Sequence, residues 1–425
     1  MRYLNPKWLR SAELSGLYLF AFSMPTMESV KWAGFLIYFL STVLRRYVSK
    51  SPSWRRPDGF EWFLLFMGLS ALLSTLINWP LLNGFSGFKK TLTYLLLGWL
   101  IYTDKFSHRE VQGLIYAITA GLMVGLVWSA YDFFSGRNPH LEFKSIPNLN
   151  RSAIYQLLSI FVMLGAVLDK RLYTIRTRAV FGCLFMISVL GLIYMGSRAT
   201  LLGFLVGGLI LAVSTIRKPK GWLGLIFGIV MLVAAVSAIT MVLDNPRLNA
   251  RINKFTHYYH DLRSGGGIKA AMTESEQVRY DYARIAWAQV NQKGRCLLGT
   301  GPDTYKYIDV QSLKFSKPLT ILKKDSWTGP SHAHNEFLTR WVEIGLVGLG
   351  IHLLFLGFVA VKLFHSRRQG DYLSWHWVAG LGFLVTALVC GMFNTVLRSE
   401  MGWLSMIILG MAIQISKTPA GRVAE

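Results

Sequence analysis

Long apolar runs separated by short polar stretches recur from one end of the chain to the other. Each run is about 20 residues long, the length that a helix needs to cross the hydrocarbon core of a bilayer. They do not alternate with the period of two that strands of a membrane barrel would show. We therefore predict an all-α polytopic membrane protein with about twelve transmembrane helices, near residues 12–28, 31–45, 60–78, 84–103, 110–134, 152–168, 178–196, 198–214, 221–243, 335–363, 374–396 and 400–416.

The predicted helices divide the chain into three parts. Residues 1–243 hold helices one to nine, residues 244–334 form one large polar loop, and residues 335–425 hold the last three helices and a short tail. Within the loop, apolar residues at helical spacing over 275–291 predict an amphipathic helix. The Ser-Gly-Gly-Gly run at 264–267 predicts a hinge. A loop of this length is usually functional.

Composition and charge agree with a membrane protein. Of the 425 residues, 52% are apolar and 16% are charged, whereas about 25% are charged in soluble domains. The formal net charge is +23, but many Lys and Arg lie in short loops on one side, as the positive-inside rule requires. We therefore expect contact with membrane lipids and no nucleic acid. The rule places the N-terminus in the cytoplasm and the large loop outside. Three cysteines support no disulfide framework.

The most distinctive polar motif lies where the large loop returns to the membrane, as Ser-His-Ala-His-Asn-Glu at 331–336. The spacing predicts that His334 shares one helix face with Gly345 and Gly348, so that another helix packs closely beneath the imidazole. A general base at neutral pH is one interpretation, because the ordinary pKa of histidine is about 6.5. An interfacial polar residue is the other.

A metal site is a further interpretation of the same motif. His332, His334 and Glu336 all have side chains that bind metals, but the loop has no other cluster of His or Cys at ligand spacing. The chain also lacks an Asp-x-Asp motif. We therefore expect neither a metal nor a cofactor.

Arginines are the second class of candidate residue. Arg198 opens the eighth predicted helix on the outer face, where its charge either reaches lipid headgroups or binds an anion. Arg279 and Arg284 lie on the predicted loop helix, as solvated surface charges or as parts of a cationic pocket with Arg198. Asn394, near the outer end of the eleventh helix, is a residue that bonds across helices or supports the site. Arginines can stabilise a diphosphate leaving group without a metal. The residues together indicate group transfer from a lipid-linked diphosphate.

The histidine motif also resembles a known family. His334-Asn335, nine residues, Gly345, two residues and Gly348 are similar to the H-N-x9-G-x-x-G signature of the O-antigen ligase/polymerase superfamily.

Two other features are similar to that superfamily. Ser197-Arg198 opens a predicted helix, and Arg279 precedes the Leu-Gly-Thr-Gly-Pro run at 298–302. The number of predicted helices and the single large loop also fit.

The resemblance implies a membrane-embedded glycosyltransferase of the GT-C class in the bacterial inner membrane, with its active site on the periplasmic side. Ligases of the family move an O-antigen polysaccharide from undecaprenyl diphosphate to the lipid A–core oligosaccharide, with inversion and without a metal. By this resemblance His334 would activate the acceptor hydroxyl, and Arg198 and Arg279 would hold the diphosphate. Arg284, on the same predicted loop helix as Arg279, is a further candidate for the diphosphate from the residues alone. Asn394 stands where relatives often carry an acidic residue.

Other activities compete with the ligase. O-antigen polymerases usually have two sizeable outer loops, whereas the second one here, near 135–151, is short. Protein O-oligosaccharyltransferases tend to carry a larger C-terminal extension. Both differences favour the ligase. A transporter or flippase of lipid-linked glycans is an alternative of another class, although no two-fold repeat is evident. A non-catalytic scaffold for glycan assembly is the third. The residues predict no particular oligomeric state.

Overall fold

The computed structural model describes residues 5–49, 57–78, 82–216, 274–292, 295–315, 319, 332–368 and 374–415, and these ranges contain helices but no β-strand. The first group of helices comprises α1 (Pro6–Ser23), α2 (Glu28–Val48), α3 (Gly59–Ile77), α4 (Leu82–Thr103), α5 (His108–Phe134), α6 (Leu149–Leu168), α7 (Ile175–Met195) and α8 (Arg198–Ile216). The second comprises α12 (Glu274–Val290), α13 (Arg295–Leu298), the 3-10 turns η1 (Tyr305–Tyr307) and η2 (Val310–Ser312), α14 (Glu336–Arg368), α15 (Trp375–Val389), the 3-10 turn η4 (Cys390–Met392) and α16 (Ser399–Ile415).

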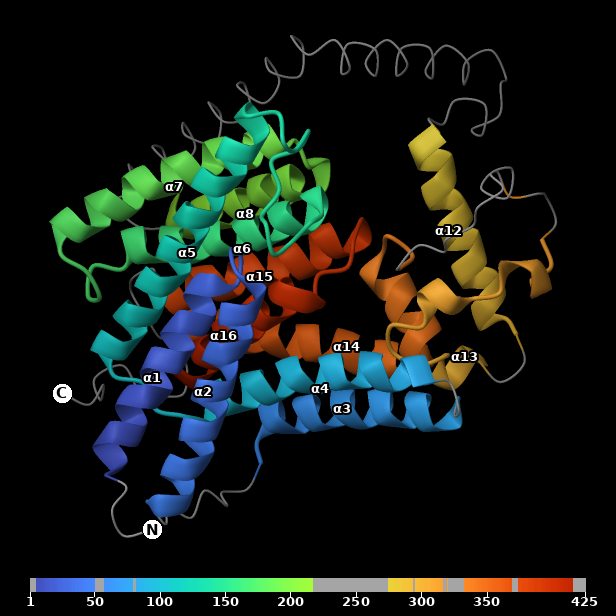
Figure 1. The fold of residues 1–425 in the computed structure, drawn as a ribbon, viewed down its shortest axis with the longest axis horizontal. Helices are drawn as coiled ribbons and strands as arrows, with labels where there is room; N and C mark the ends of the chain where they lie inside the picture. Colours follow the sequence, from blue (N-terminus) through green and yellow to red (C-terminus); the bar gives the residue numbers. More distant parts are fainter. Residues whose placement is uncertain are drawn as a thin grey trace.

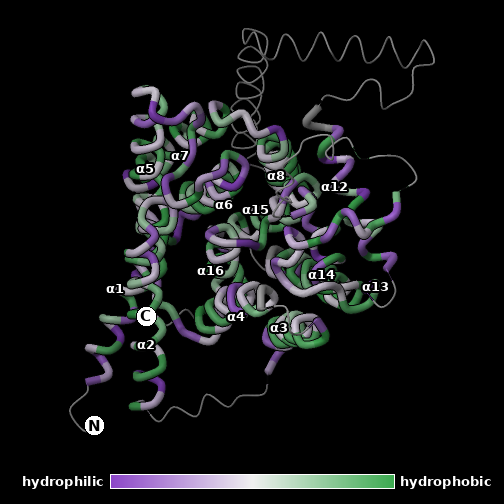
Figure 2. Tube along the Cα trace, turned by 45° about the vertical axis from the view of Figure 1, so that its right-hand side comes forward, coloured by the Kyte–Doolittle hydropathy of each residue, from purple (hydrophilic) through white to green (hydrophobic). Residues whose placement is uncertain are grey.

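The helices confirm an all-α membrane protein. Among the described helices, six are suited to cross a membrane by length and composition, namely α3, α5, α6, α7, α14 and α15 together with η4. The helices α8 and α16 are shorter and also apolar. The loop helix expected at 275–291 is present as α12 and carries more hydrophilic residues than α3 (Figure 2). The ninth predicted helix at 221–243 and the hinge at 264–267 lie outside the described residues. The total of twelve helices and the outer position of the loop stay predictions.

The interior of the helical bundle is built around α6 and α15, which pack against each other (Figure 1). Close contact requires small residues, because a Cβ on Gly165 of α6 would lie 2.8 Å from the carbonyl oxygen of Trp375. The starts of α6, α8 and α14 and the end of α15 meet at one end of the bundle, as the side-chain bonds described below show. We call this the His334 end.

A second, smaller hydrophobic core lies beside the bundle. It joins α12 to η1, η2 and α14, and its buried residues are Ile285, Ala286, Val290, Tyr305, Ile308, Val310, Leu313, Leu319, Ala333 and Val342. Tyr305 strengthens this junction, because its hydroxyl donates a hydrogen bond to the carbonyl of Tyr282 (2.6 Å). The core therefore fixes α12 beside the beginning of α14.

The long helix α14 is interrupted at Gly345, which has φ 69° and ψ −176°. The break frees the carbonyls of Val342 and Glu343, which instead accept hydrogen bonds from the backbone N–H of Thr300 (2.9 Å) and Gly301 (2.8 Å). A Cβ on Gly345 would lie 2.0 Å from the carbonyl oxygen of Leu297. The chain from α13 to η1 thus crosses α14 at this glycine, and we call residues 296–304 the crossing segment.

The structure corrects the expected role of the two glycines. Gly345 gives room to the crossing segment rather than to a neighbouring helix, and a Cβ on Gly348 would meet the side chain of Ile344 in its own helix (2.5 Å). His334 also lies before the first residue of α14, so it does not belong to a continuous helix face with these glycines. The pattern of small residues was correct, but the close approach is made by an irregular segment of the loop.

Candidate functional site

His334 is held by the turn that leads into α14. Asn335 caps this helix, since its Oδ1 accepts the backbone N–H of Leu338 (2.9 Å), while its Nδ2 donates to the carbonyl of Met392 (3.0 Å). Thr339 Oγ1 accepts the N–H of Ala333 (3.1 Å) and donates to the carbonyl of Asn335 (2.7 Å). Within this frame His334 has a φ of 52°. Left-handed conformations of residues other than glycine are uncommon and cluster at functional sites.

The half-buried imidazole of His334 lies between two other rings. It stacks on Tyr282 of α12, with centroids 5.5 Å apart and planes 10° from parallel, and the ring of His332 lies 4.6 Å away. Its Nδ1 is buried and has no hydrogen-bond partner among the described residues. Burial, and then the positive charges of Arg279 and Arg151, lower its pKa to about 4. The imidazole is therefore neutral at pH 7 and able to accept a proton.

His332 is buried and is paired with Asn394, whose Oδ1 lies 3.0 Å from the histidine Nε2. The same oxygen accepts the backbone N–H of Thr395 (2.9 Å). Because an amide oxygen only accepts, Nε2 of His332 carries the hydrogen and donates it. Burial, followed by the charges of His334 and the nearby arginines, lowers the pKa of His332 to about 3. Asn394 therefore orients His332. This hydrogen bond joins two segments that are distant in sequence, which is one of the two roles predicted for Asn394.

Two arginines place positive charge next to the histidines. Arg279 lies on α12, one turn before Tyr282, and its charge acts on His334. Arg151 lies in the first turn of α6, and its charge acts on both His332 and His334. The Nε of Arg151 is buried and has no hydrogen-bond partner among the described residues.

The sequence arguments missed Arg151, which stands one residue before the predicted helix at 152–168. An available signal was its position in a short outer loop, where the positive-inside rule disfavours arginine.

Arg198 begins α8 at the His334 end of the bundle and is exposed. Its neighbours are fixed there, because Ser197 Oγ donates to Asn150 Oδ1 (3.2 Å) and Cys390 Sγ lies 3.4 Å from the carbonyl of Ala199. The first bond joins the start of α8 to the turn that carries Arg151. The structure thus brings Arg198 to the same end of the bundle as the histidines.

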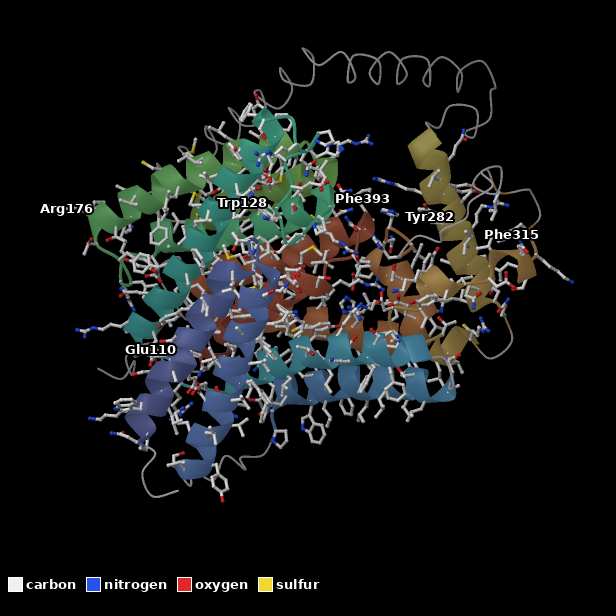
Figure 3. All side chains as sticks on the ribbon, viewed as in Figure 1. Glu110, Trp128, Arg176, Tyr282, Phe315 and Phe393 are labelled. Carbon is white, nitrogen blue, oxygen red and sulfur yellow. The ribbon has the colours of Figure 1, made fainter. Side chains whose placement is uncertain are left out.

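Arg284 has a different setting from Arg279. Its guanidinium forms an ion pair with Asp281 (3.1 Å) and lies 5.6 Å from the ring centroid of Phe315. Tyr282 and Phe315 are on opposite sides of α12 (Figure 3). The geometry therefore groups Arg279 with His334 and places Arg284 on the far side of the helix, so the expected pocket of three arginines is not supported by these contacts.

Ion pairs connect the crossing segment and α14 to Arg398, the residue before α16. Arg398 pairs with Glu343 and with Asp303 (3.3 Å), and Asp303 also binds Lys90 (2.7 Å) and Lys306 (3.5 Å). Asp303 therefore faces three cations. Glu343 and Asp303 are thus engaged by cations, while the charges of Arg151, Arg279 and Arg398 act on the histidines.

Glu336, the acid nearest to the histidines in sequence, is also engaged. It accepts hydrogen bonds from Arg340 Nε (2.7 Å) and from the backbone N–H of Val396 (2.9 Å). Through these bonds the carboxylate of Glu336 joins α14 to the segment before α16. In the described part of the chain, no three His, Cys, Asp or Glu side chains are grouped so that they could hold a metal ion.

A comparison with protein families gives a match over part of the chain. Residues 183–353 match the family described as O-Antigen ligase, and the match contains Arg198, Arg279, His334 and Gly345. This match supports membership of the chain in the O-antigen ligase superfamily. The resemblance of the histidine motif is thereby confirmed. No curated protein matches the chain. Arg151 lies outside the matched residues.

Membership of the O-antigen ligase superfamily indicates the general class of activity. Proteins of this superfamily are glycosyltransferase-like membrane enzymes, and the family implies polysaccharide-linked lipid substrates. A neutral histidine beside several arginines at the meeting point of the helix ends is chemically suited to such substrates.

Proposed function

We propose that this protein is an O-antigen ligase. It transfers an O-antigen polysaccharide from undecaprenyl diphosphate to the lipid A–core oligosaccharide at the periplasmic face of the bacterial inner membrane. The proposal is carried by one observation: the neutral imidazole of His334 is stacked on Tyr282 within the field of Arg279 and Arg151. This arrangement places a proton acceptor next to cations suited to a diphosphate.

In the proposed reaction His334 is the general base. It removes the proton from the acceptor hydroxyl while the hydroxyl oxygen attacks the anomeric carbon of the donor sugar. The bond from that carbon to the diphosphate oxygen breaks with inversion, and undecaprenyl diphosphate leaves with the bonding electron pair. General-base catalysis of this kind contributes roughly 10²–10⁴-fold to the rate. The step needs no metal, because cationic side chains stabilise the charge that develops on the leaving group.

Arg279, Arg151 and Arg198 are the groups that we assign to the diphosphate. The buried Nε of Arg151 lacks a hydrogen-bond partner among the described residues, and such a group costs about 1–3 kcal/mol when it stays unsatisfied. A phosphate oxygen would satisfy it and would match the guanidinium geometry. Binding of the anion would also offset the two charges that depress the pKa of His334, so the donor itself would make the histidine a stronger base.

The geometry offers less support for the related activities. The segment between α5 and α6 is confined to residues 135–148 and includes a backbone bridge between Phe143 and Ile146. This compact segment is unlike the second sizeable outer loop of polymerases. A transporter would instead expose ionisable groups near the middle of the bundle, whereas the residues named above gather at one end.

The deciding experiment uses the purified chain in vesicles with undecaprenyl-diphosphate-linked polysaccharide and lipid A–core. We expect the glycan to appear on the core, and His334→Ala to lower the ligation rate by roughly 10²–10⁴-fold. His140→Ala is the matched control, because His140 is exposed in the segment between α5 and α6, and it should keep the wild-type rate.

Other outcomes would identify the competing functions. Longer glycan on the lipid carrier, with none on the core, would indicate a polymerase. Movement of the donor across the bilayer without a new glycosidic bond would indicate a transporter. Near-normal ligation by folded His334→Ala protein would exclude this histidine as the base.

A further inference from the structure

A cavity lies on the side of α12 that faces away from His334. Its volume is about 750 Å³, within the range of roughly 300–1,000 Å³ typical of small-molecule sites. Arg284 and Trp287 line it from α12, Asn291 and Gln292 line it just beyond the end of that helix, and Lys314 and Phe315 line it from the segment after η2. The helical spacing of Arg284 and Trp287 places them about half a turn around α12 from Tyr282. We call this space the α12 cavity.

Trp287 gives the α12 cavity a large aromatic surface. Its side chain is 57% exposed, yet it is held in place by edge-on contact with the ring of Trp341, at 5.5 Å and 84°. Trp341 is itself fixed by a hydrogen bond from its Nε1 to the carbonyl of Cys296 (3.3 Å). A fixed indole with an exposed surface provides the flat apolar platform on which the C–H face of a sugar ring can stack.

Polar groups surround this platform. Asn291 donates its Nδ2 to the carbonyl of Trp287 (2.9 Å), which leaves the amide Oδ1 for a ligand hydroxyl, and Gln292 follows it in sequence. The guanidinium of Arg284 pairs with Asp281 and lies against the ring of Phe315.

Charge narrows the class of ligand further. Lys314 adds a second positive charge to that of Arg284, and no acidic residue stands among the described residues that line the cavity. Asp281 pairs with Arg284 (3.1 Å) and offsets one of these charges. The positive charge that remains favours an anionic ligand and disfavours a metal ion.

We propose that the α12 cavity binds a sugar unit that carries a carboxylate or phosphate group. Trp287 stacks on the ring, Asn291 and Gln292 bind hydroxyls, and Arg284 and Lys314 bind the anionic substituent. This inference rests on the proposed function, which supplies a glycan on both the donor and the acceptor. Because a helix with its side chains is about 10–12 Å thick, the bound unit lies beyond the sugar that reacts at His334.

Binding can be measured without turnover. The full chain in lipid nanodiscs is titrated with glucose, glucuronate and glucose 6-phosphate, and binding is followed by saturation-transfer NMR. We expect the two anionic sugars to bind more tightly than glucose, and Trp287→Ala to weaken them about tenfold, the factor that corresponds to about 1.4 kcal/mol. Arg284→Gln or Lys314→Gln should remove the preference for the anionic sugars.

Two controls separate this cavity from the rest of the molecule. Trp62→Ala removes another exposed tryptophan, on α3, where the ring stacks on Phe66 at 5.7 Å, and it should bind all three sugars as wild type does. His334→Ala should also bind them normally, so failure of the proposed ligase activity and failure of the α12 cavity give different results. Trp287→Phe keeps a ring and should retain most of the affinity if Trp287→Ala does not fold.

Kinetics identify the source of the sugar. With Trp287→Ala, a raised KM for lipid A–core at saturating donor assigns the unit to the acceptor, and a raised KM for the lipid-linked polysaccharide assigns it to the donor. The kcat should stay within about twofold of wild type, because binding energy that is equal in the ground state and the transition state changes KM and not kcat. Equal affinity of wild type and Trp287→Ala for the anionic sugars would overturn the proposal. So would an effect of Trp287→Ala on bilayer insertion alone, which would make Trp287 a membrane-interface anchor.

Discussion

Replacement of Gly345 by alanine tests the interruption of α14. The backbone there, with φ 69° and ψ −176°, lies in a region that essentially only glycine occupies. The added Cβ would lie 2.0 Å from the carbonyl oxygen of Leu297 and 2.4 Å from the backbone nitrogen of Leu298. These are backbone atoms of the crossing segment, so no side-chain rotation can relieve the contact.

The loss of stability in Gly345→Ala can be worked out from the backbone strain and from the hydrogen bonds that break. Backbone strain at such a position is about 1–3 kcal/mol. Relief of the clash requires the crossing segment to withdraw, which breaks the bonds from Thr300 to Val342 and from Gly301 to Glu343, each worth about 0.5–1.5 kcal/mol. Gly345→Ala should therefore destabilise the protein by about 2–6 kcal/mol. The same withdrawal displaces Tyr305, which supports Tyr282 beside His334.

The assay combines thermal unfolding in detergent with ligation in vesicles. We expect Gly345→Ala to unfold at a lower temperature. The folded fraction should ligate roughly 10²-fold more slowly, because a shift of about 1 Å in the position of a catalytic group can lower the rate by this factor. Gly350→Ala is the matched control, since it lies in the same helix and a Cβ there meets no atom within 4 Å. If Gly345→Ala were as stable and active as Gly350→Ala, the assigned role of the crossing segment would be wrong.

Three further predictions concern the charges of the site. Because burial and two arginines lower the pKa of His334 to about 4, kcat/KM should be constant down to about pH 5 and fall as more acidic conditions protonate the base. The decline of kcat should begin at a higher pH, because bound diphosphate raises this pKa, and coincident profiles would contradict that effect. Arg151→Gln should raise the KM for the lipid-linked donor and leave the KM for the acceptor within about twofold, as initial rates at varied concentrations of each will test. Glu336→Gln leaves the buried charge of Arg340 without its acid, so chemical or thermal unfolding should report a loss of about 3–5 kcal/mol, and an unchanged midpoint would count against a structural role for this pair.

Local pattern was sufficient to predict the helices and the central motif. The apolar runs fixed the all-α class, and the helical spacing over 275–291 identified α12. The His334-Asn335 pair and the glycines after it identified the superfamily that the match over 183–353 confirms. These features depend on residues close together in the chain, where hydrophobic periodicity and spacing are visible in the sequence.

Tertiary structure decided which of these residues meet. A glycine within an apolar helix is compatible with a continuous helix, and α14 is interrupted at Gly345 because Thr300 and Gly301 satisfy the carbonyls that the break exposes. Arg151 comes to the histidines from α6, whereas Arg284 pairs with Asp281 and lies against Phe315. Such contacts join segments that are far apart in sequence, and their energies depend on how the helices cross. The chain therefore encodes its helices locally, but the charge and reactivity of His334 arise only when distant segments pack around it.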